Sequence, residues 1–424
     1  MPPPGACRKE GEGLDSVSRR QLWAIVGISS LLSVVFSGLD VAFTVFSVNR
    51  LELPASDLAL LRSLRLAVTI PFILLMGGIA DAWGQKKTAT AAIVVLAAAS
   101  VLTVANPGKG MLFATFPLYG GVSAILLVSM NVFSQGVKNE LRGLSNTLYR
   151  STFIGFAIAG PLCAGLLIES GFAAAFLAFA AIALLSLAAL SLYPQDRREA
   201  GTSRETVRQT AARMADGWKS LLRDKPLLAY MLMNGLLNHT LMVNLVLIPV
   251  KLMDDLGVSS GDYSRVMTLS SIVGLLFTIA AGFLMKKHLS KLITVPMLLS
   301  AACNLASGLE SSAWLTIALF ILSSALYTVT MAPTSLWLGE MARRQFGTIF
   351  GIFKVMSAGI GFLVSASLSV VQSGLGIDMA LVAYGIFGVL ASLLFMRLMS
   401  KWQAAAGRTV PDSIRQTSQK DVTT

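Results

Sequence analysis

The chain has 424 residues, of which 54% are hydrophobic and only 13% are charged. A soluble domain usually carries about 25% charged residues, so this composition excludes an ordinary soluble protein. Apolar runs of 18 or more residues recur along the whole chain. A helix of about 20 residues crosses the hydrocarbon core of a bilayer, so the sequence predicts an all-α polytopic membrane protein.

Taken in chain order, the apolar runs predict twelve transmembrane helices in two sets of six. Residues 1–20 form an N-terminal tail, 21–194 the first six-helix bundle, 195–225 a polar linker, 226–400 the second bundle and 401–424 a C-terminal tail. The predicted spans are 22–46, 57–80, 89–106, 111–134, 146–168, 171–193, 227–250, 263–285, 292–309, 313–338, 347–371 and 378–398.

The basic residues set the orientation of these spans. The formal net charge is +12, but 25 of the 34 lysines and arginines fall in the two tails, the linker and the even-numbered loops. Positive charge accumulates on the cytoplasmic side of membrane proteins. The sequence thus predicts that both termini are cytoplasmic, in the cell inner membrane, and the positive charge does not indicate a nucleic-acid partner.

Uncharged polar residues recur with a period of three spans. Spans 1, 4, 7 and 10 hold most of them, whereas spans 3, 6 and 12 are almost wholly apolar. Polar side chains inside a membrane face other helices or a water-filled cavity, so one helix in each triplet is predicted to line a cavity. Structural hydrogen bonding is the alternative for His239. The substrate-contact candidates on these spans are Tyr119, Ser123, Asn131, Asn234, Asn238, His239 and Tyr327.

The stretch GGIADAWGQKK occupies the loop between spans 2 and 3. A glycine permits a tight turn or a close helix contact, and a carboxylate is stabilised at a helix N-terminus. The stretch resembles the G-x-x-x-D-x-x-G-x-[RK]-[RK] signature of the major facilitator superfamily. The residues that match are Gly77, Asp81, Gly84, Lys86 and Lys87.

This resemblance implies the major facilitator fold, with twelve helices in two six-helix bundles that rock about a midplane site. It also implies that Asp81 contacts the start of span 11 while the cytoplasmic side is closed, which would make the loop a conformational switch. Lys86 and Lys87 are expected to anchor the loop to anionic headgroups. The alternative for the two lysines is that they serve topology alone.

Span 5 contains the stretch AGPLCAG, which partly resembles the glycine-proline signature of antiporters in the superfamily. Gly160, Pro161 and Gly165 fit the signature, whereas Ala164 and Phe156 replace glycines. The resemblance favours export. A proline kink with packing glycines is the structural alternative.

Span 1 contains SGLDVAFTVF, which resembles the acidic motif of the drug/proton antiporters. Asp40 lies at a depth similar to that of Arg62 and Arg65 in span 2, so we expect Asp40 to pair with one of them. This trio is the candidate for proton coupling, and a fixed ion pair is the alternative. Phe116 stands where related exporters carry an arginine, and Arg62 or Arg65 is expected to substitute for it.

The two halves also show a weak repeat. A shift of 204 residues aligns Gly143 with Gly347, Arg150 with Lys354, and Gly155 with Gly359. Lys354 is a candidate contact for an anionic substrate group, and snorkelling of its ammonium group to the membrane surface is the alternative.

These features predict a secondary transporter that exports a small organic molecule, such as a drug, a siderophore or another metabolite, by proton antiport. The alternative is a proton-coupled importer of an organic anion. The sequence contains no ATP-binding P-loop and no motif of a membrane enzyme, so it predicts neither an enzyme nor a cofactor or metal. The predicted partners of this monomer are the substrate, protons and the lipid bilayer.

Overall fold

The computed structural model describes residues 10–135, 137, 141–193, 216, 218–219, 221–341 and 346–407, and contains no strand within these ranges. The first half comprises α1 (Glu10–Val45), η1 (Phe46–Arg50), α2 (Ala55–Trp83), α3 (Gln85–Ala105), α4 (Lys109–Gln135), α5 (Arg142–Ala157), α6 (Ala159–Glu169) and α7 (Phe172–Leu192). The second half comprises α9 (Lys225–Leu237), α10 (His239–Val250), η3 (Lys251–Asp255), α11 (Ser260–Leu309), α12 (Ala313–Met341) and α13 (Phe346–Gly407). The short segments η1 and η3 are π-helical turns.

Each of the twelve predicted spans coincides with helix, but several ends differ from the prediction. Helix α1 begins at Glu10, inside the predicted tail, and α13 continues to Gly407, inside the other tail. Helix α11 runs through the predicted loop between spans 8 and 9 without a break. Helix α13 covers spans 11 and 12, which are separated at Gly376, where φ is 78°. Only a glycine adopts that backbone conformation without strain.

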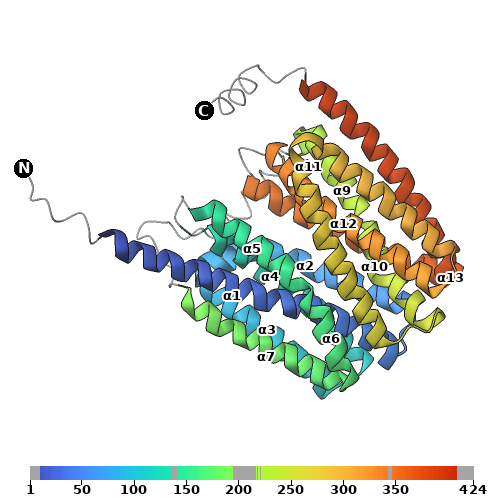
Figure 1. The fold of residues 1–424 in the computed structure, drawn as a ribbon, viewed down its shortest axis with the longest axis horizontal. Coiled ribbons are helices and arrows are strands. Elements are labelled where there is room, and N and C mark those ends of the chain that lie inside the picture. Colours follow the sequence, from blue (N-terminus) through green and yellow to red (C-terminus); the bar gives the residue numbers. More distant parts are fainter. Residues whose placement is uncertain are drawn as a thin grey trace, which may run out of the picture.

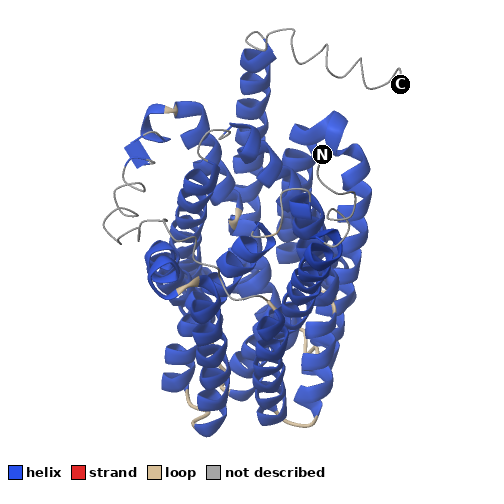
Figure 2. Ribbon diagram, turned by 90° about the vertical axis from the view of Figure 1, so that its left-hand side faces the viewer, coloured by secondary structure: helices blue, strands red, loops and turns tan. Residues whose placement is uncertain are grey.

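The helices form two groups that follow each other in the chain, as the colours in Figure 1 show. In the first group, α1 packs against α5, α6 and α7, while α4 packs against α2 and α3. In the second group, α11 packs against α12 and α13, and α13 also packs against α9 and α10. The groups meet along two seams, α2 with α13 and α6 with α11. Figure 2 shows the helices running side by side, with short loops at their ends.

Two predicted spans are broken near their middle. Span 5 is divided into α5 and α6 at Ile158, three residues before Pro161. Proline has no N–H group, so the carbonyl of Ala157 loses its helical hydrogen bond there. Span 7 is divided into α9 and α10 at Asn238, whose N–H turns back to the carbonyl of Gly235 at 3.1 Å.

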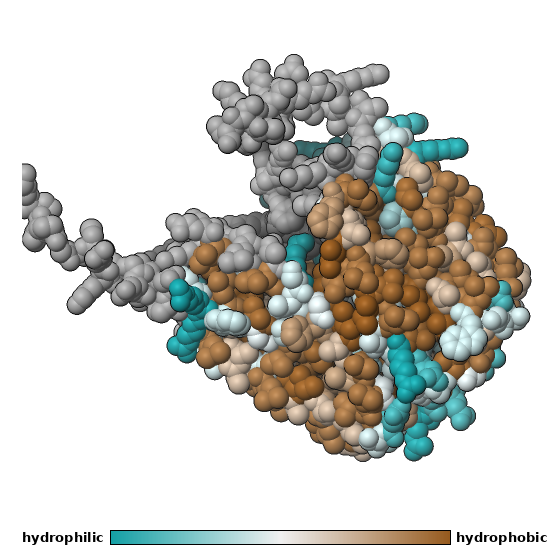
Figure 3. Space-filling view, in the orientation of Figure 1, coloured by the Kyte–Doolittle hydropathy of each residue, from teal (hydrophilic) through white to brown (hydrophobic). Residues whose placement is uncertain are grey.

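Large apolar side chains cover much of the outer surface. Figure 3 shows a broad hydrophobic face with hydrophilic residues gathered toward its edges. Phe283 and Trp314 are 84% and 83% exposed, and Val370 is 72% exposed. Ten described helices are long and apolar enough to cross a membrane, and one of them, Ile352–Lys401, covers two predicted spans. The fold is that of a multi-pass membrane protein, because such a surface is stable only in lipid.

The two bundles are joined by polar contacts at one end, which we call the η end because η1 and η3 meet there. Asn49 of η1 donates a hydrogen bond to Ser260 at the start of α11. Arg265 of α11 lies 4.0 Å from Glu169, the last residue of α6. These two contacts hold the bundles together at the η end. We call the opposite end, where α1 begins and α13 finishes, the termini end.

Candidate functional site

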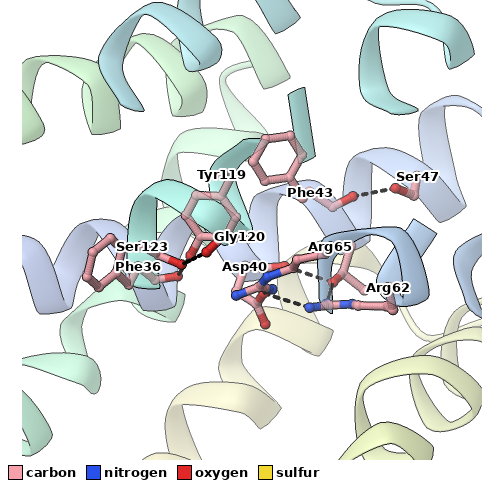
Figure 4. A network of polar contacts seen from close by, with 10 residues as sticks. Phe36, Asp40, Phe43, Ser47, Arg62, Arg65, Tyr119, Gly120 and Ser123 are labelled. Carbon is pink, nitrogen blue, oxygen red and sulfur yellow. Dashed lines mark hydrogen bonds and ion pairs between the residues drawn. The ribbon is translucent and has the colours of Figure 1, made fainter. Parts of the chain in front are cut away.

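Asp40 of α1 lies between two arginines of α2, as Figure 4 shows. The Oδ1 atom of Asp40 accepts a hydrogen bond from Nη1 of Arg62 at 2.7 Å and a second one from Nη1 of Arg65. Nη2 of Arg62 donates to Oγ1 of Thr44 at 2.7 Å, one turn along α1. The structure therefore places the whole predicted trio together, and Asp40 pairs with both arginines rather than with one.

The trio differs in accessibility. The side chain of Arg62 is 3% exposed, while those of Arg65 and Asp40 are 22% and 20% exposed. The second carboxylate oxygen of Asp40, Oδ2, accepts no hydrogen bond from any described residue. Because α1 continues into η1 as far as Arg50, Asp40 lies ten residues, or about 15 Å, from the η end of this span.

Aromatic side chains of α4 support the two guanidinium groups. Arg62 and Arg65 lie over the ring of Phe116, with their Cζ atoms 5.0 Å and 5.1 Å from its centroid. The Cζ atom of Arg65 also lies 4.7 Å from the centroid of Tyr119. A guanidinium group is attracted to the face of an aromatic ring. The two arginines of α2 thus bring their charge to Phe116 of α4, the position at which the resemblance implied an arginine.

Sequence reasoning missed the glycine that permits this arrangement. A Cβ atom on Gly120 of α4 would lie 2.3 Å from Cγ of Arg65 and 2.9 Å from its carbonyl oxygen. Any larger residue would push α2 away from α4. The paired glycines that follow Tyr119 in the sequence were the available signal, since a glycine inside a helix often marks a close approach.

A second polar cluster, without charge, lies in the other bundle. Tyr327 of α12 donates its hydroxyl hydrogen to Oδ1 of Asn238 at 2.7 Å, and Nδ2 of Asn238 donates to Oγ of Ser357 in α13. Asn238 stands at the break between α9 and α10, and its side chain is partly buried. The predicted candidates Asn238 and Tyr327 are therefore in contact, and Ser357 is a third member that the sequence reasoning did not select.

The other predicted substrate contacts have local partners. Asn234 is 4% exposed and donates to Oγ1 of Thr334 at 3.4 Å. His239 is 1% exposed and lies edge-on to Phe387, and its Nδ1 is 3.0 Å from the carbonyl of Leu236. His239 is thus enclosed within its own bundle, against the part of α13 that forms span 12. This environment matches the structural alternative for the histidine.

Three candidates on α4 point into the first bundle or bond along their own helix. Tyr119 is 1% exposed, and its hydroxyl donates to the carbonyl of Phe36 at 2.8 Å. Ser123 donates to the carbonyl of Gly120 at 2.9 Å, and Asn131 donates to that of Leu127 at 2.9 Å. Tyr119 therefore acts as a wall of the charged cluster and does not face open space.

The loop between α2 and α3 contains the turn that the sequence predicted. Gly84 has a φ of 90° and stands directly before the first residue of α3. Nζ of Lys86 donates to the carbonyl of Tyr193 at 2.6 Å, at the end of α7, while Lys87 is exposed. Lys86 thus binds a helix C-terminus, where a cation is stabilised. Gly77 and Asp81 lie in α2, but their side chains are outside the described ones.

The glycine-proline segment of span 5 packs tightly on both bundles. A Cβ atom on Gly160 would lie 2.0 Å from Oγ of Ser37 and 2.7 Å from the carbonyl oxygen of Val34, both in α1. A Cβ atom on Gly165 would lie 2.6 Å from Cβ of Ser264 in α11. Pro161 is buried between these contacts. This geometry fits the structural alternative given for the segment, in which the proline kinks the helix and the glycines allow close helix packing.

Comparisons with known proteins agree with this architecture. The family model of the Major Facilitator Superfamily matches residues 22–246 and 237–422. The puromycin resistance protein pur8 of Streptomyces alboniger is 33% identical over 186 residues, which is 42% of this chain and 37% of that protein. The matched segment thus spans little more than a third of this curated relative.

Several solved structures share the fold. A bacterial homologue of the lysosomal transporter Spinster, in an inward-facing and unoccupied conformation, has a TM-score of 0.74 at 13% identity, over 90% of this chain and 97% of that one. The nucleoside transporter NupG has a TM-score of 0.69 at 14% identity, over 90% and 99%. A D-xylose–proton symporter has a TM-score of 0.69 at 15% identity, over 89% and 96%.

Two six-helix bundles that meet along two seams, with polar clusters inside, define a membrane transporter. The chain belongs to the major facilitator superfamily, because the family model covers almost the whole of it. It is a transporter of small molecules and not an enzyme. Among the described residues, no group of three or more histidine, cysteine, aspartate or glutamate side chains could hold a metal ion.

Proposed function

We propose that this protein exports a small organic molecule, such as a drug, a siderophore or another metabolite, by proton antiport with alternating access. In this proposal both termini are cytoplasmic, the protein acts as a monomer in the inner membrane, and the η end faces outward. The observation that carries the proposal is the carboxylate of Asp40, which has one oxygen bound by two arginines and the other without a hydrogen bond from any described residue.

Such a carboxylate suits a proton carrier. When it is ionised, Asp40 neutralises one of the two guanidinium charges and draws α1 and α2 together. When it is protonated at Oδ2, both guanidinium groups lose their counter-charge inside a poorly solvated site, which is costly. Protonation would therefore weaken the link between α1 and α2 and favour a different arrangement of the helices.

The direction of transport rests on resemblance. The relative that shares 33% identity over 186 residues is a puromycin resistance protein. Gly160, Pro161 and Gly165 resemble the antiporter signature. The alternative, proton-coupled import of an organic anion, is favoured by the cationic side chains of Arg150 and Lys354, which are exposed within the predicted spans.

Two measurements test the proposal. An untargeted comparison of the metabolites retained by cells with and without the gene would identify the transported compounds. Each compound is then offered to inverted membrane vesicles with an acidic interior. Antiport predicts that the compound accumulates inside, and that Asp40→Asn abolishes the accumulation. Uptake into intact cells that an acidic exterior drives would instead establish the importer.

A further inference from the structure

The second bundle holds the stretch of α2 that carries both arginines of the charged cluster. Oγ of Ser365 in α13 donates a hydrogen bond to the carbonyl of Ala59 in α2 at 2.8 Å. Gly361 of α13 lies against Leu66 of α2, since a Cβ atom on the glycine would be 3.0 Å from Cδ1 of the leucine. The two contacts bracket residues 59–66, and the two arginines lie between them. The position of this stretch therefore depends on α13.

The hydrogen bond across this seam is fully buried. Ser365 and Ala59 are both 0% exposed. Oγ of Ser63, which is also 0% exposed, donates to the same carbonyl at 2.8 Å, but from within α2. The carbonyl of Ala59 thus receives one hydroxyl group from its own helix and one from the opposite bundle. Only the second bond is lost when the bundles separate at this seam, and such a bond contributes about 1 kcal/mol.

Asp40 and its two arginines belong to helices with different neighbours. Helix α1, which carries Asp40, packs on α5, α6 and α7 of its own bundle. Helix α2 packs on α4 of its own bundle and on α13 of the other, and it packs much less on α1. The two ion pairs therefore join a helix that is held by one bundle to a helix that is held by both. A movement of α13 changes the support of the arginines without changing that of Asp40.

The ionised form of Asp40 is maintained by these arginines. Among the described residues, the other titratable groups that interact electrostatically with Asp40 are Tyr119 of α4 and Tyr263 of α11. A tyrosine is neutral at physiological pH, so it supplies no counter-charge. An opposite charge close to a carboxylate favours the charged form, and its removal favours protonation. Asp40 therefore binds a proton least readily when both guanidinium groups lie against it, as they do while the seam between α2 and α13 is closed.

We propose that Ser365 is a positioning residue through which the second bundle controls the proton site. This inference rests on the proposed function and names the link between bundle movement and proton exchange. While the seam is closed, the bond from Ser365 keeps the arginine stretch of α2 against Asp40, which stays ionised. When the η end opens, the bond breaks and α2 is released from α13, so Asp40 takes up a proton from that side. An antiporter takes up its proton from the side to which it exports the substrate, which is the order that this link provides.

A matched pair of serine variants tests the link, because both hydroxyl groups bind the same carbonyl at the same distance. The reporter is Ser264→Cys, at a residue that is 1% exposed and packs on Gly165 in the seam between α6 and α11. The three native cysteines are first replaced by serine. In purified full-length protein in detergent, a charged methanethiosulfonate reagent labels this cysteine when the η end opens. Ser365→Ala is expected to raise the labelling rate about fivefold, and Ser63→Ala to leave it unchanged.

The pH dependence of labelling separates a positioning role from simple packing. Linkage is reciprocal, so if opening favours protonation of Asp40, protonation must favour opening. Acidic pH is therefore expected to raise the labelling rate about fivefold or more relative to the same reporter in an Asp40→Asn background, which cancels the ionisation of the thiol itself. In proteoliposomes, Ser365→Ala should move the pH of half-maximal flux upward by up to about 0.7 units, with the apparent KM unchanged, whereas Ser63→Ala should not move it.

Three results would each overturn the inference. The first is an unchanged labelling rate in Ser365→Ala, and the second is an equal increase in Ser63→Ala. The third is a rate whose ratio to that of the Asp40→Asn background does not change with pH. Because labelling needs no substrate, none of these results bears on whether the protein exports a molecule. Failure to find any compound whose transport depends on Asp40 would instead refute the proposed function, and the labelling rates would still decide whether Ser365 links the seam to Asp40.

Discussion

The two bundles carry different kinds of polar cluster. The first bundle holds a charged one, in which Asp40 contacts Arg62 and Arg65. The second holds a neutral one, in which Asn238 contacts Tyr327 and Ser357. A charged cluster changes its energy strongly when a proton binds, whereas neutral hydrogen bonds do not. The difference suggests that the first bundle couples transport to protons and that the second recognises the substrate.

The second bundle also contains a buried charge, but its surroundings are fixed. Nζ of Lys251, in η3, donates to the carbonyls of Ser307 and Glu310 at 2.7 Å each and to Asp378 at 2.6 Å. The side chain of Lys251 is 2% exposed, and three separate segments of the bundle meet on it. Because its donors are engaged by two carbonyls at the end of α11 and by Asp378 of α13, this lysine acts as a clamp between these segments. Charge alone therefore does not distinguish a coupling group from a structural one.

The largest effect is expected for Asp40→Asn. The amide cannot carry a negative charge, so the two arginines lose their counter-charge and no proton is exchanged. We expect proton-driven flux in proteoliposomes to fall about 100-fold, at the upper end of typical coupling free energies. Asp57→Asn is the matched control, because Asp57 pairs with Lys109 at the surface. Full gradient-driven flux in the asparagine variant would assign Asp40 to structure.

Asp81→Ala tests whether the termini end joins the two bundles during transport. A carboxylate at a helix N-terminus contributes up to about 2 kcal/mol, so losing it should slow turnover roughly tenfold. The apparent KM should change much less, because the predicted contact forms and breaks between conformations. Turnover and KM would be measured on the same proteoliposomes. An unchanged turnover number would remove the switch role.

Asn238→Ala tests the assignment of recognition to the second bundle. If the amide of Asn238 makes one hydrogen bond to the substrate, its loss removes about 1 kcal/mol, so the apparent KM should rise about fivefold. The pH dependence of flux should stay as in the parent protein, in contrast to Asp40→Asn. Asn131→Ala, which breaks a hydrogen bond along α4 only, is the control. A shifted pH profile in the Asn238 variant would contradict the assignment of proton coupling to the first bundle alone.

Lys251→Met is expected to have the smallest effect on transport. Removing the clamp leaves two carbonyls and one carboxylate without their donor, so we expect a loss of about 2 kcal/mol of stability. Thermal unfolding of the purified protein should shift downward by about 2–4 °C. Flux per folded molecule, and its dependence on the pH gradient, should be unchanged. Loss of coupling in this variant would give the lysine a functional role.

Much of the fold follows from the sequence because a bilayer imposes simple rules. Apolar length fixed the number of spans, and the match of every predicted span to helix confirms that part. Loops were predicted less well. The segment between spans 8 and 9 continues as helix α11, since residues 286–291 contain neither a proline nor a glycine that would end the helix. Pro161 predicted a disturbance of span 5, and the break lies three residues before it.

The sequence predicted which charged residues form the site but not the side chains that pack around them. The pairing of Asp40 with Arg62 or Arg65 was predicted from their similar depth in spans 1 and 2, which are antiparallel neighbours. The packing of both arginines on Phe116 depends on how α2 crosses α4, and Gly120 controls that crossing. His239 shows a second limit, since the sequence does not say which residues of a cavity-lining span turn into their own bundle, as His239 does beside Phe387.

The sequence by itself determined the membrane class, the number of spans, the family signature and the residues that carry charge, because these depend on composition and local spacing. Tertiary structure decided which oxygen of Asp40 is bound and which candidates are enclosed. Those properties depend on helix rotation and crossing, which are set by side-chain packing between segments far apart in the chain.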